Sequence, residues 1–309
     1  METIMMPETR RQRRERQRSR ADMTGAVECT LQDLLFPVEI RNEEMPTNSE
    51  FSRMVVGQLN GGDFKLNQCS PRYELFPNAN IFPEIERILD SNNIQYRAEY
   101  SHIDNVRFYV DYIITDTRYT YTMKGTSDTI FPKLSVQHSY NGKTKYKIIF
   151  GYFRLICTNG LTIPVQEMKR FNLVIVGKHT EAIKHSFAQL DGMLKFFVAE
   201  ADLVIGTITN RYETLGGRMV ANVQDRIKEV LGAAKIIAVE NNKFNTVTDI
   251  LNRIKAEANN PTLGYNGRVT DWLVYNGINQ YVNDDSRNIV APELRMETDS
   301  KVLEYMLES

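Results

Sequence analysis

The spacing of apolar residues changes near Gly177, and this change limits the folds that the chain can adopt. Before it, runs rich in β-branched and aromatic residues are typical of strands; they are Ile94–Tyr100, Val106–Thr115, Leu134–Ser139, Thr144–Thr158 and Leu161–Val165. After it, apolar residues recur at helical spacing in residues 179–210, 220–229, 246–259 and 270–282. Strands first and helices second predict an α+β fold, with a central antiparallel sheet of long strands followed by a helical C-terminal half.

Short polar segments predict where these elements turn or end. Asn141-Gly142 is a hairpin signal, and Asn159-Gly160 is a second turn signal. Asn78 or Asn80 can cap a helix that runs to about Asp90. Two short extended segments are expected earlier in the chain, Phe64–Asn67 and Tyr73–Phe76. Within the long helix, Gly192 lowers the helix propensity and could mark a kink.

Three regions follow from this reading. Residues 1–50 are expected to form a basic, largely irregular arm, whose one apolar patch, at residues 31–36, can dock on the body or on a partner. Residues 51–285 are expected to form a single α+β domain, with the sheet in 51–176 and helices in 177–285. Residues 286–309 are expected to form an acidic tail.

Charge is distributed unevenly, although the whole chain has a net charge of −1. Residues 1–20 contain seven arginines and three glutamates, so the remaining residues carry a net charge of −5. An arginine-rich arm can neutralise phosphates, or it can become ordered on a protein partner. Residues 95–160 form a second basic region, with nine basic and five acidic residues.

Composition also predicts the setting of the protein. No run of about eighteen apolar residues occurs, and Met1–Arg20 lacks the apolar segment of a secretory signal, so we expect neither a membrane span nor export. The 3 cysteines are far apart, which suits a reducing compartment and favours the cytoplasm.

Motifs of common enzymes are absent from the sequence. It has no phosphate-binding loop, dinucleotide fingerprint, His-Glu-x-x-His, Cys-x2-Cys or hydrolase elbow. Cys157 could pair with His179 or His185 as nucleophile and base, but its apolar surroundings favour a core thiol. Scattered carboxylates such as Asp284 and Asp285 show no recognisable metal-binding order. We therefore expect no catalytic residue, no metal and no cofactor.

The most distinctive pattern is an alternation of lysines. Lys143, Lys145 and Lys147 share one face of the expected strand, because side chains alternate along a strand. Three like charges on one face favour a polyanion beside them. Nine of the 15 tyrosines lie between Tyr96 and Tyr152, and aromatic rings beside basic groups are typical of single-strand binders. The predicted nucleic-acid contacts are Lys143, Lys145, Lys147, Arg107, Arg118, Tyr119, Tyr121 and Lys178.

Several segments together resemble the phage/plasmid-like protein family catalogued as domain of unknown function 932. They are Arg72–Asn78, Phe153–Gly160, Gly177–Thr180 and Thr270–Val282. Lys178 stands where the family resemblance would lead us to expect arginine. The resemblance implies a mobile-element setting and a cytoplasmic protein. Within these segments, Arg154 is expected to pair with an acid, Trp272 to pack a helix on the body, and Lys178-His179-Thr180 to cap a helix or receive a phosphate.

The leading hypothesis is a non-enzymatic protein that binds or anneals single-stranded nucleic acid, most simply single-stranded DNA, during replication or recombination of a phage or mobile element. The order of strands and helices is also similar to that of single-strand annealing proteins, which implies a homo-oligomer. The alternative is a structural or interaction protein, such as a virion component or a protein-binding inhibitor, whose arginine-rich arm becomes ordered on a partner. The net charge of −5 outside residues 1–20 favours this alternative.

Overall fold

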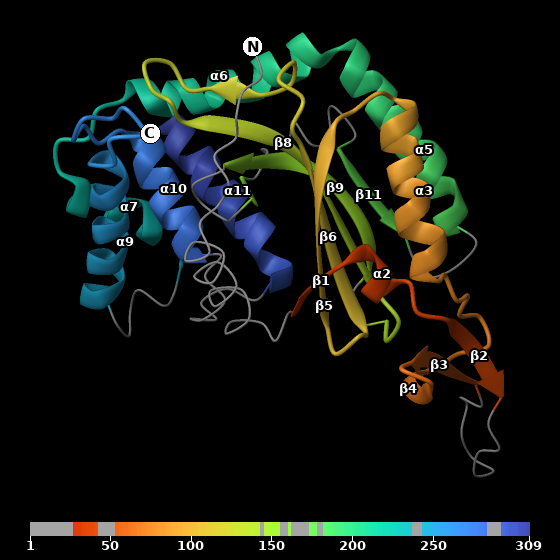
Figure 1. The fold of residues 1–309 in the computed structure, drawn as a ribbon. Coiled ribbons are helices and arrows are strands. Elements are labelled where there is room, and N and C mark those ends of the chain that lie inside the picture. The colour runs from red at the N-terminus through yellow and green to blue at the C-terminus, as the bar shows by residue number, and fades with distance from the viewer. Residues whose placement is uncertain are drawn as a thin grey trace.

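The structure is a computed structural model that describes residues 27–42, 53–142, 145–154, 160–161, 173–177, 182–236, 243–282 and 292–309. Strands dominate its N-terminal half and helices its C-terminal half, so the predicted α+β fold is confirmed (Figure 1). The strands form two antiparallel sheets, one large and one of three strands. The small sheet lies at one end of the molecule, away from the C-terminal helices (Figure 1).

The large sheet has the strand order β1-β5-β6-β8-β9-β10, with β7 paired to β8 and β11 paired to β9. Its strands are β1 (Val27–Cys29), β5 (Tyr96–Ile103), β6 (Arg107–Ile114), β7 (Tyr121–Thr122), β8 (Thr129–Ser139), β9 (Tyr146–Arg154), β10 (Gly160–Leu161) and β11 (Val174–Gly177). The hairpin signal at Asn141-Gly142 lies between β8 and β9, which pair antiparallel as expected. The small sheet contains β2 (Val38–Asn42), β3 (Arg53–Leu59) and β4 (Gly62–Cys69) in that order.

The helices lie in two groups. Two of them, α3 (Asn78–Ser91) and α5 (Ala182–Ala199), pack side by side on one face of the large sheet, and α6 (Ala201–Gly217) continues from α5 (Figure 1). The second group packs beside α6 and consists of α7 (Val223–Ala233), α9 (Lys243–Ala258), α10 (Asp271–Val282) and α11 (Pro292–Glu308). A short helix, α2 (Leu31–Leu34), contacts α3.

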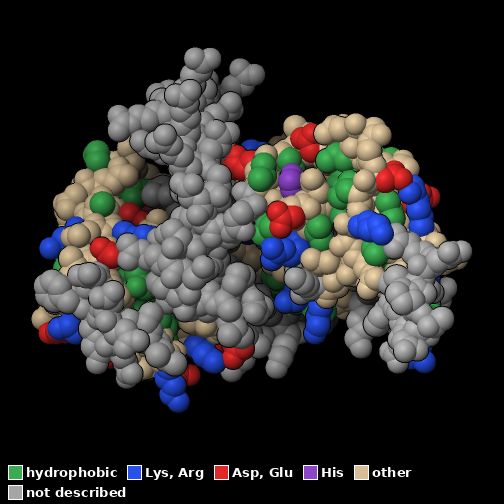
Figure 2. Space-filling view, turned by 90° about the horizontal axis from the view of Figure 1, so that it is seen from below, with side chains coloured by type: hydrophobic (Ala, Val, Ile, Leu, Met, Phe, Trp, Pro, Cys, Tyr) green, Lys and Arg blue, Asp and Glu red, His purple; other side chains and the backbone are tan. Residues whose placement is uncertain are grey.

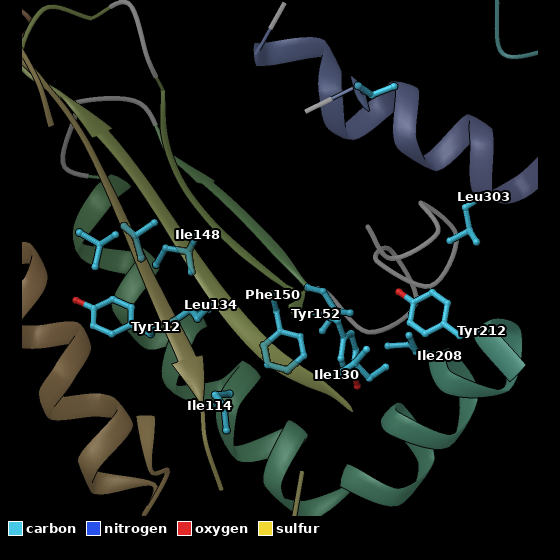
Figure 3. Packing of buried hydrophobic residues seen from close by; sticks show 14 of the residues in the cluster. Tyr112, Ile114, Ile130, Leu134, Ile148, Phe150, Tyr152, Ile208, Tyr212 and Leu303 are labelled. Carbon is cyan, nitrogen blue, oxygen red and sulfur yellow. The ribbon is translucent and has the colours of Figure 1, made fainter. Parts of the chain in front are cut away.

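The core forms between the large sheet and these helices. Alternate residues of β6, β8 and β9 are buried, among them Tyr112, Leu134 and Phe150 (Figure 3). Phe150 packs on Phe197 of α5 with ring centroids 4.7 Å apart. Farther along the sheet, the aromatic contacts continue from Tyr152 to Tyr212 of α6, with ring centroids 6.4 Å apart, and from Tyr212 to Trp272 of α10, with centroids 4.9 Å apart. One continuous core therefore joins both halves of the chain.

The predicted long helix over residues 179–210 differs from the structure. The chain forms two helices that meet at Glu200, and Gly192 lies inside α5. Gly192 is on the surface, where a Cβ would meet no other atom within 4 Å. An exposed glycine in a helix lowers helix propensity without forcing the axis to bend.

Both ends of the described chain are more ordered than the sequence suggested. Within the predicted irregular arm, residues 27–42 form β1, α2 and β2, and the Thr30 hydroxyl caps α2 in a reciprocal arrangement with Asp33. Leu34 and Phe36 are buried, so the apolar patch docks on the body. The acidic tail contains α11, whose buried apolar residues are Val302, Leu303 and Met306. By contrast, Tyr73–Phe76, predicted as extended, is not part of any strand.

Within the part of the chain that the structure describes, no helix is both long and apolar enough to cross a bilayer.

Candidate nucleic-acid interface

The large sheet has a second face, opposite its core face, that is rich in polar side chains. We call it the outer face; in β5, β6, β8 and β9 its members alternate with core residues and are Arg97, Glu99, Ser101, Ile103, Arg107, Tyr109, Asp111, Ile113, Phe131, Lys133, Ser135, Gln137, Lys147 and Ile149. Antiparallel register places directly opposed residues on the same face. One row across the strands therefore contains Ser101, Tyr109, Gln137 and Lys147.

Several charges on the outer face already have partners within the molecule. Arg97 pairs with Glu99 at 3.2 Å. The Lys133 ammonium lies 3.1 Å from one Asp111 oxygen, and the Ser135 hydroxyl donates to the other at 2.7 Å. Glu99 and Asp111 are directly opposite each other on neighbouring strands. Each of these two carboxylates is balanced by a cation of its own, Arg97 or Lys133. This part of the face is close to neutral and has little need of an external counter-ion.

Three basic side chains at the β8–β9 end of the sheet differ from these pairs. We call Arg107, Lys145 and Lys147 the hairpin corner. Lys145 is exposed just before β9, Lys147 is half-buried on β9, and Arg107 is half-buried at the start of β6. No described carboxylate pairs with any of the three. Lys147 lies on the outer face of β9, Lys145 precedes that strand, and Lys143 lies outside the described residues.

Overall charge does not by itself mark this corner. Seen from below, the described surface shows groups of Lys and Arg side chains beside Asp and Glu side chains (Figure 2). The hairpin corner instead differs from the rest of the outer face because its basic side chains have no carboxylate partner among the described residues. Since an unpaired ammonium or guanidinium group keeps its full field, it attracts an anionic ligand more strongly than a cation that already has a carboxylate partner.

The predicted residues Arg118, Tyr119 and Tyr121 lie at the opposite end of the sheet. Tyr121 is opposite Ile130, whereas Lys147 is opposite Gln137, and these two residues of β8 are roughly 23 Å apart at about 3.3 Å per residue. The sequence prediction that joined them with the lysines in one site is therefore wrong.

Their side chains are also engaged. The Arg118 guanidinium pairs with Asp116 at 2.5 Å, which lowers the pKa of that carboxyl. Tyr119 is 3% exposed and packs on Phe197, so a base cannot stack on its ring, and this prediction is wrong. The Tyr121 hydroxyl donates to Glu213 at 2.7 Å. Burial, followed by this contact with Glu213, raises the pKa of Tyr121 to about 12.

Sequence reasoning did not single out Tyr109. All 15 tyrosines are within the described residues, and 14 of them belong to the core or pack against it. Tyr109 is the exception: it is half-buried on the outer face, and its hydroxyl bonds to no described residue. A signal was present in the sequence, because Tyr109 is two residues from Arg107 on one strand and must share its face.

A buried charge cluster ties the sheet to the C-terminal helices. Arg154 and Asp128 are both fully buried, and the Arg154 Nε donates to both Asp128 oxygens at 2.8 Å. Asp128 also accepts hydrogen bonds from Tyr265 Oη at 2.7 Å and from Trp272 Nε1 at 2.9 Å. Arg154 Nη1 donates to Glu257 at 2.5 Å. We call these five residues the clasp.

The clasp confirms two expectations, that Arg154 pairs with an acid and that Trp272 packs a helix on the body. Burial opposes ionisation of Asp128, but the hydrogen bonds and charge of Arg154 outweigh it and lower the pKa of Asp128. Burial and the Asp128 carboxylate raise the pKa of Tyr265. Because Arg154 and Asp128 have no exposed surface, the clasp supports the fold rather than offering groups to a ligand.

The sequence model of a family described as a domain of unknown function, DUF932, matches residues 65–303. The chain belongs to the DUF932 family. No curated protein and no solved structure matches this DUF932 chain. The matched region contains the hairpin corner, Tyr109 and the clasp, whereas β1, α2, β2 and β3 precede it.

The other candidate residues of this DUF932 chain have mixed outcomes. Lys178, Cys157 and His179, like Asp284 and Asp285, lie outside the described residues. His185 is exposed on α5. Among the residues that the structure does describe, no three His, Cys, Asp or Glu side chains gather in a way that could hold a metal ion.

Proposed function

We propose that this DUF932 protein binds nucleic acid at the hairpin corner, and that it acts by binding rather than by catalysis. The observation that supports this proposal is the gathering of Arg107, Lys145 and Lys147, without carboxylate partners among the described residues, at one end of the outer face. The basic groups nearer the other end, in contrast, are balanced by Glu99 and Asp111.

The spacing of the corner suits a phosphate backbone. Lys145 and Lys147 are two residues apart in the chain, or about 6.7 Å at about 3.3 Å per residue of extended backbone. This separation is close to that of neighbouring phosphates in an extended single strand. Arg107 begins the strand two places away in the sheet and can bind a further phosphate with its guanidinium fork. Each phosphate that is neutralised releases counter-ions, so binding must weaken with salt.

In the cell, the protein would coat or anneal single strands, most simply single-stranded DNA, during replication or recombination of a phage or mobile element. It would act as a homo-oligomer in the cytoplasm. The arginine-rich residues 1–20 would add non-specific attraction to phosphates. These proposals rest on the sequence resemblance and on the charge pattern.

A filter-binding salt titration tests the proposed function. The Arg107→Ala/Lys145→Ala/Lys147→Ala variant should weaken binding of a single-stranded oligonucleotide. Its slope of log affinity against log salt should be shallower by about 2, at roughly 0.7 per lost phosphate contact. Lys124→Ala is the matched control, because Lys124 is an exposed lysine near the other end of the sheet. Wild-type affinity and slope in the triple variant would exclude the hairpin corner as the site.

A structural or interaction protein is the second candidate function. The net charge of −5 outside residues 1–20 supports it, because an acidic body repels a polyanion. In that case, the arginine-rich arm would bind an acidic protein surface. A pull-down of partners that persists after nuclease treatment, together with no oligonucleotide binding by the purified protein, would favour this candidate.

A further inference from the structure

We infer that Tyr109 stacks on an unpaired base, so that the ligand of the hairpin corner is single-stranded nucleic acid. This inference rests on the proposed function and extends it from phosphate contacts to recognition of bases. It also replaces Tyr119 and Tyr121, which the structure places at the other end of the sheet, with a tyrosine in the same row of the outer face as Lys147.

The surroundings of Tyr109 separate it from every other tyrosine of the chain. Tyrosine is common in strands because its ring packs on neighbours across the pleated surface. That explanation suits the 14 tyrosines that pack in or on the core. Core packing does not explain Tyr109, because its ring pairs with no other described aromatic ring and lies outside the packed hydrophobic cluster. Its aromatic face is therefore available to a ligand in a way that the other rings are not.

The neighbours of Tyr109 place phosphate-binding groups on either side of it. Arg107 precedes it by two residues on β6, about 6.7 Å along the strand. Gln137 is directly opposite Tyr109 on β8, and Lys147 is directly opposite Gln137 on β9. Two strand spacings put Lys147 roughly 10 Å from Tyr109. A backbone held by Arg107 and Lys147 would thus bring a base over the Tyr109 ring, with the Gln137 amide at the base edge.

Two acidic groups of the outer face close to Tyr109, Asp111 and Glu99, already have partners within the molecule. Asp111, the next outer-face residue on β6, is already bonded to Lys133 and Ser135. Glu99, opposite Asp111, pairs with Arg97. A ring on a sheet can reach the face of a base only when that base is unstacked, which is the case in a single strand and not inside a duplex. Stacking on Tyr109 therefore selects single strands, whereas the basic groups alone would attract both forms.

Fluorescence anisotropy with a labelled 20-nucleotide thymidine oligomer, and with a labelled duplex of the same length, tests the inference. Tyr109→Leu should weaken binding of the single strand about 5- to 150-fold, the range for loss of one stacked base. Tyr109→Phe should bind as the wild type does. Neither substitution should change the salt slope, because no phosphate contact is lost, and Tyr109→Leu should leave duplex binding unchanged.

Ultraviolet crosslinking to the same oligomer, followed by peptide mass spectrometry, supplies a second measurement and should place a crosslink on Tyr109. Tyr305→Leu is the matched control, because Tyr305 is also half-buried but lies on α11 and bonds to Glu229. Melting temperatures verify that each variant is folded. If Tyr109→Leu does not fold, crosslinking of the wild-type protein still shows whether Tyr109 contacts the oligomer.

The outcomes separate this inference from the proposed function. If Tyr109→Leu binds the single strand as tightly as the wild type while the hairpin-corner variant loses binding, the inference is overturned and the proposed function stands. Equal losses on single strand and duplex, or a crosslink elsewhere only, also overturn it. If the hairpin-corner variant binds as the wild type does, the proposed function itself has failed.

Discussion

Arg154 and Asp128 form a fully buried ion pair in which one guanidinium nitrogen, Nε, lies 2.8 Å from both carboxylate oxygens. The pair lies between the sheet and the C-terminal helices, since Glu257 of α9 and Trp272 of α10 complete its hydrogen bonds. Both ions are removed from water, so the Asp128 carboxylate depends on the Arg154 guanidinium to remain ionised.

Arg154→Met should therefore lower the free energy of unfolding by about 3–5 kcal/mol, because it leaves Asp128 buried without its cation. Urea denaturation followed by circular dichroism measures the change. The matched control is Arg118→Met, since Arg118 also pairs with an aspartate but its side chain is 60% exposed, and such surface pairs contribute about 1 kcal/mol or less. Equal losses in the two variants would contradict the role given to the clasp.

Stability should fall in acid because of Asp128. Its pKa is lowered in the folded state from an ordinary value of 3.8, so the folded state favours the ionised carboxylate more than the unfolded chain does. The contribution is complete at neutral pH and is lost as the pH falls below about 4 through the folded-state pKa. Asp128→Asn should be less stable at pH 7, and its stability should vary less with pH in this range. Urea unfolding at a series of pH values measures both effects, and parallel pH profiles would refute the assignment.

Tyr140 should stabilise the start of α3. The residue before this helix is Pro77, which provides no side-chain cap, and the Asn78 amide instead donates to Tyr140 Oη at 2.8 Å in a buried position. Tyr140→Phe leaves that amide without its acceptor and should cost about 1–3 kcal/mol. Thermal unfolding measures the loss. Tyr305→Phe is the control, because the Tyr305 hydroxyl bonds at the surface and its removal should cost less.

Gly277 should be required for the contact between α9 and α10. A Cβ at this position would come within 2.6 Å of Ile254 Cγ1, and Ile254 is buried. Gly277→Ala should therefore destabilise the protein, although alanine is the better helix former by about 1 kcal/mol. Gly206→Ala, where a Cβ would meet nothing within 4 Å, should instead stabilise it.

A double-mutant cycle with Ile254→Ala tests the cause. In that background, which removes the obstructing carbon, Gly277→Ala should lose its destabilising effect. If the cost of Gly277→Ala is unchanged beside Ile254→Ala, the steric explanation is wrong.

Local patterns predicted most of the fold because the relevant interactions are local. The strands of the β5–β6 and β8–β9 hairpins and the helices α3, α7, α9 and α10 follow from alternation, helical spacing and turn residues. The break at Glu200 was not predicted, because the apolar spacing continues across it. The helix α11 was missed since its buried residues are few among many charges.

The candidate site was predicted only in part, for a related reason. Parity along one strand correctly separates Lys147 from the buried Tyr146 and Ile148. Which strands lie beside each other, and at which end, depends on the register of the sheet. The sequence therefore grouped Arg107, Arg118, Tyr119 and Tyr121 with the lysines, although only Arg107 of these four lies at their end of the sheet. Tyr109, which does lie there, was missed.

The clasp also bears on how the chain can mature during translation. Asp128 and Arg154 emerge from the ribosome well before their partners Glu257, Tyr265 and Trp272, and the separation of Asp128 from Trp272 is 144 residues. Until those later residues are synthesised, the nascent sheet must keep this charged pair in water. The sheet can therefore reach its final packing only after most of the polypeptide has left the exit tunnel. In a chain that stops before Trp272, Asp128 and Arg154 would remain exposed to water, whereas both are buried in the full-length protein.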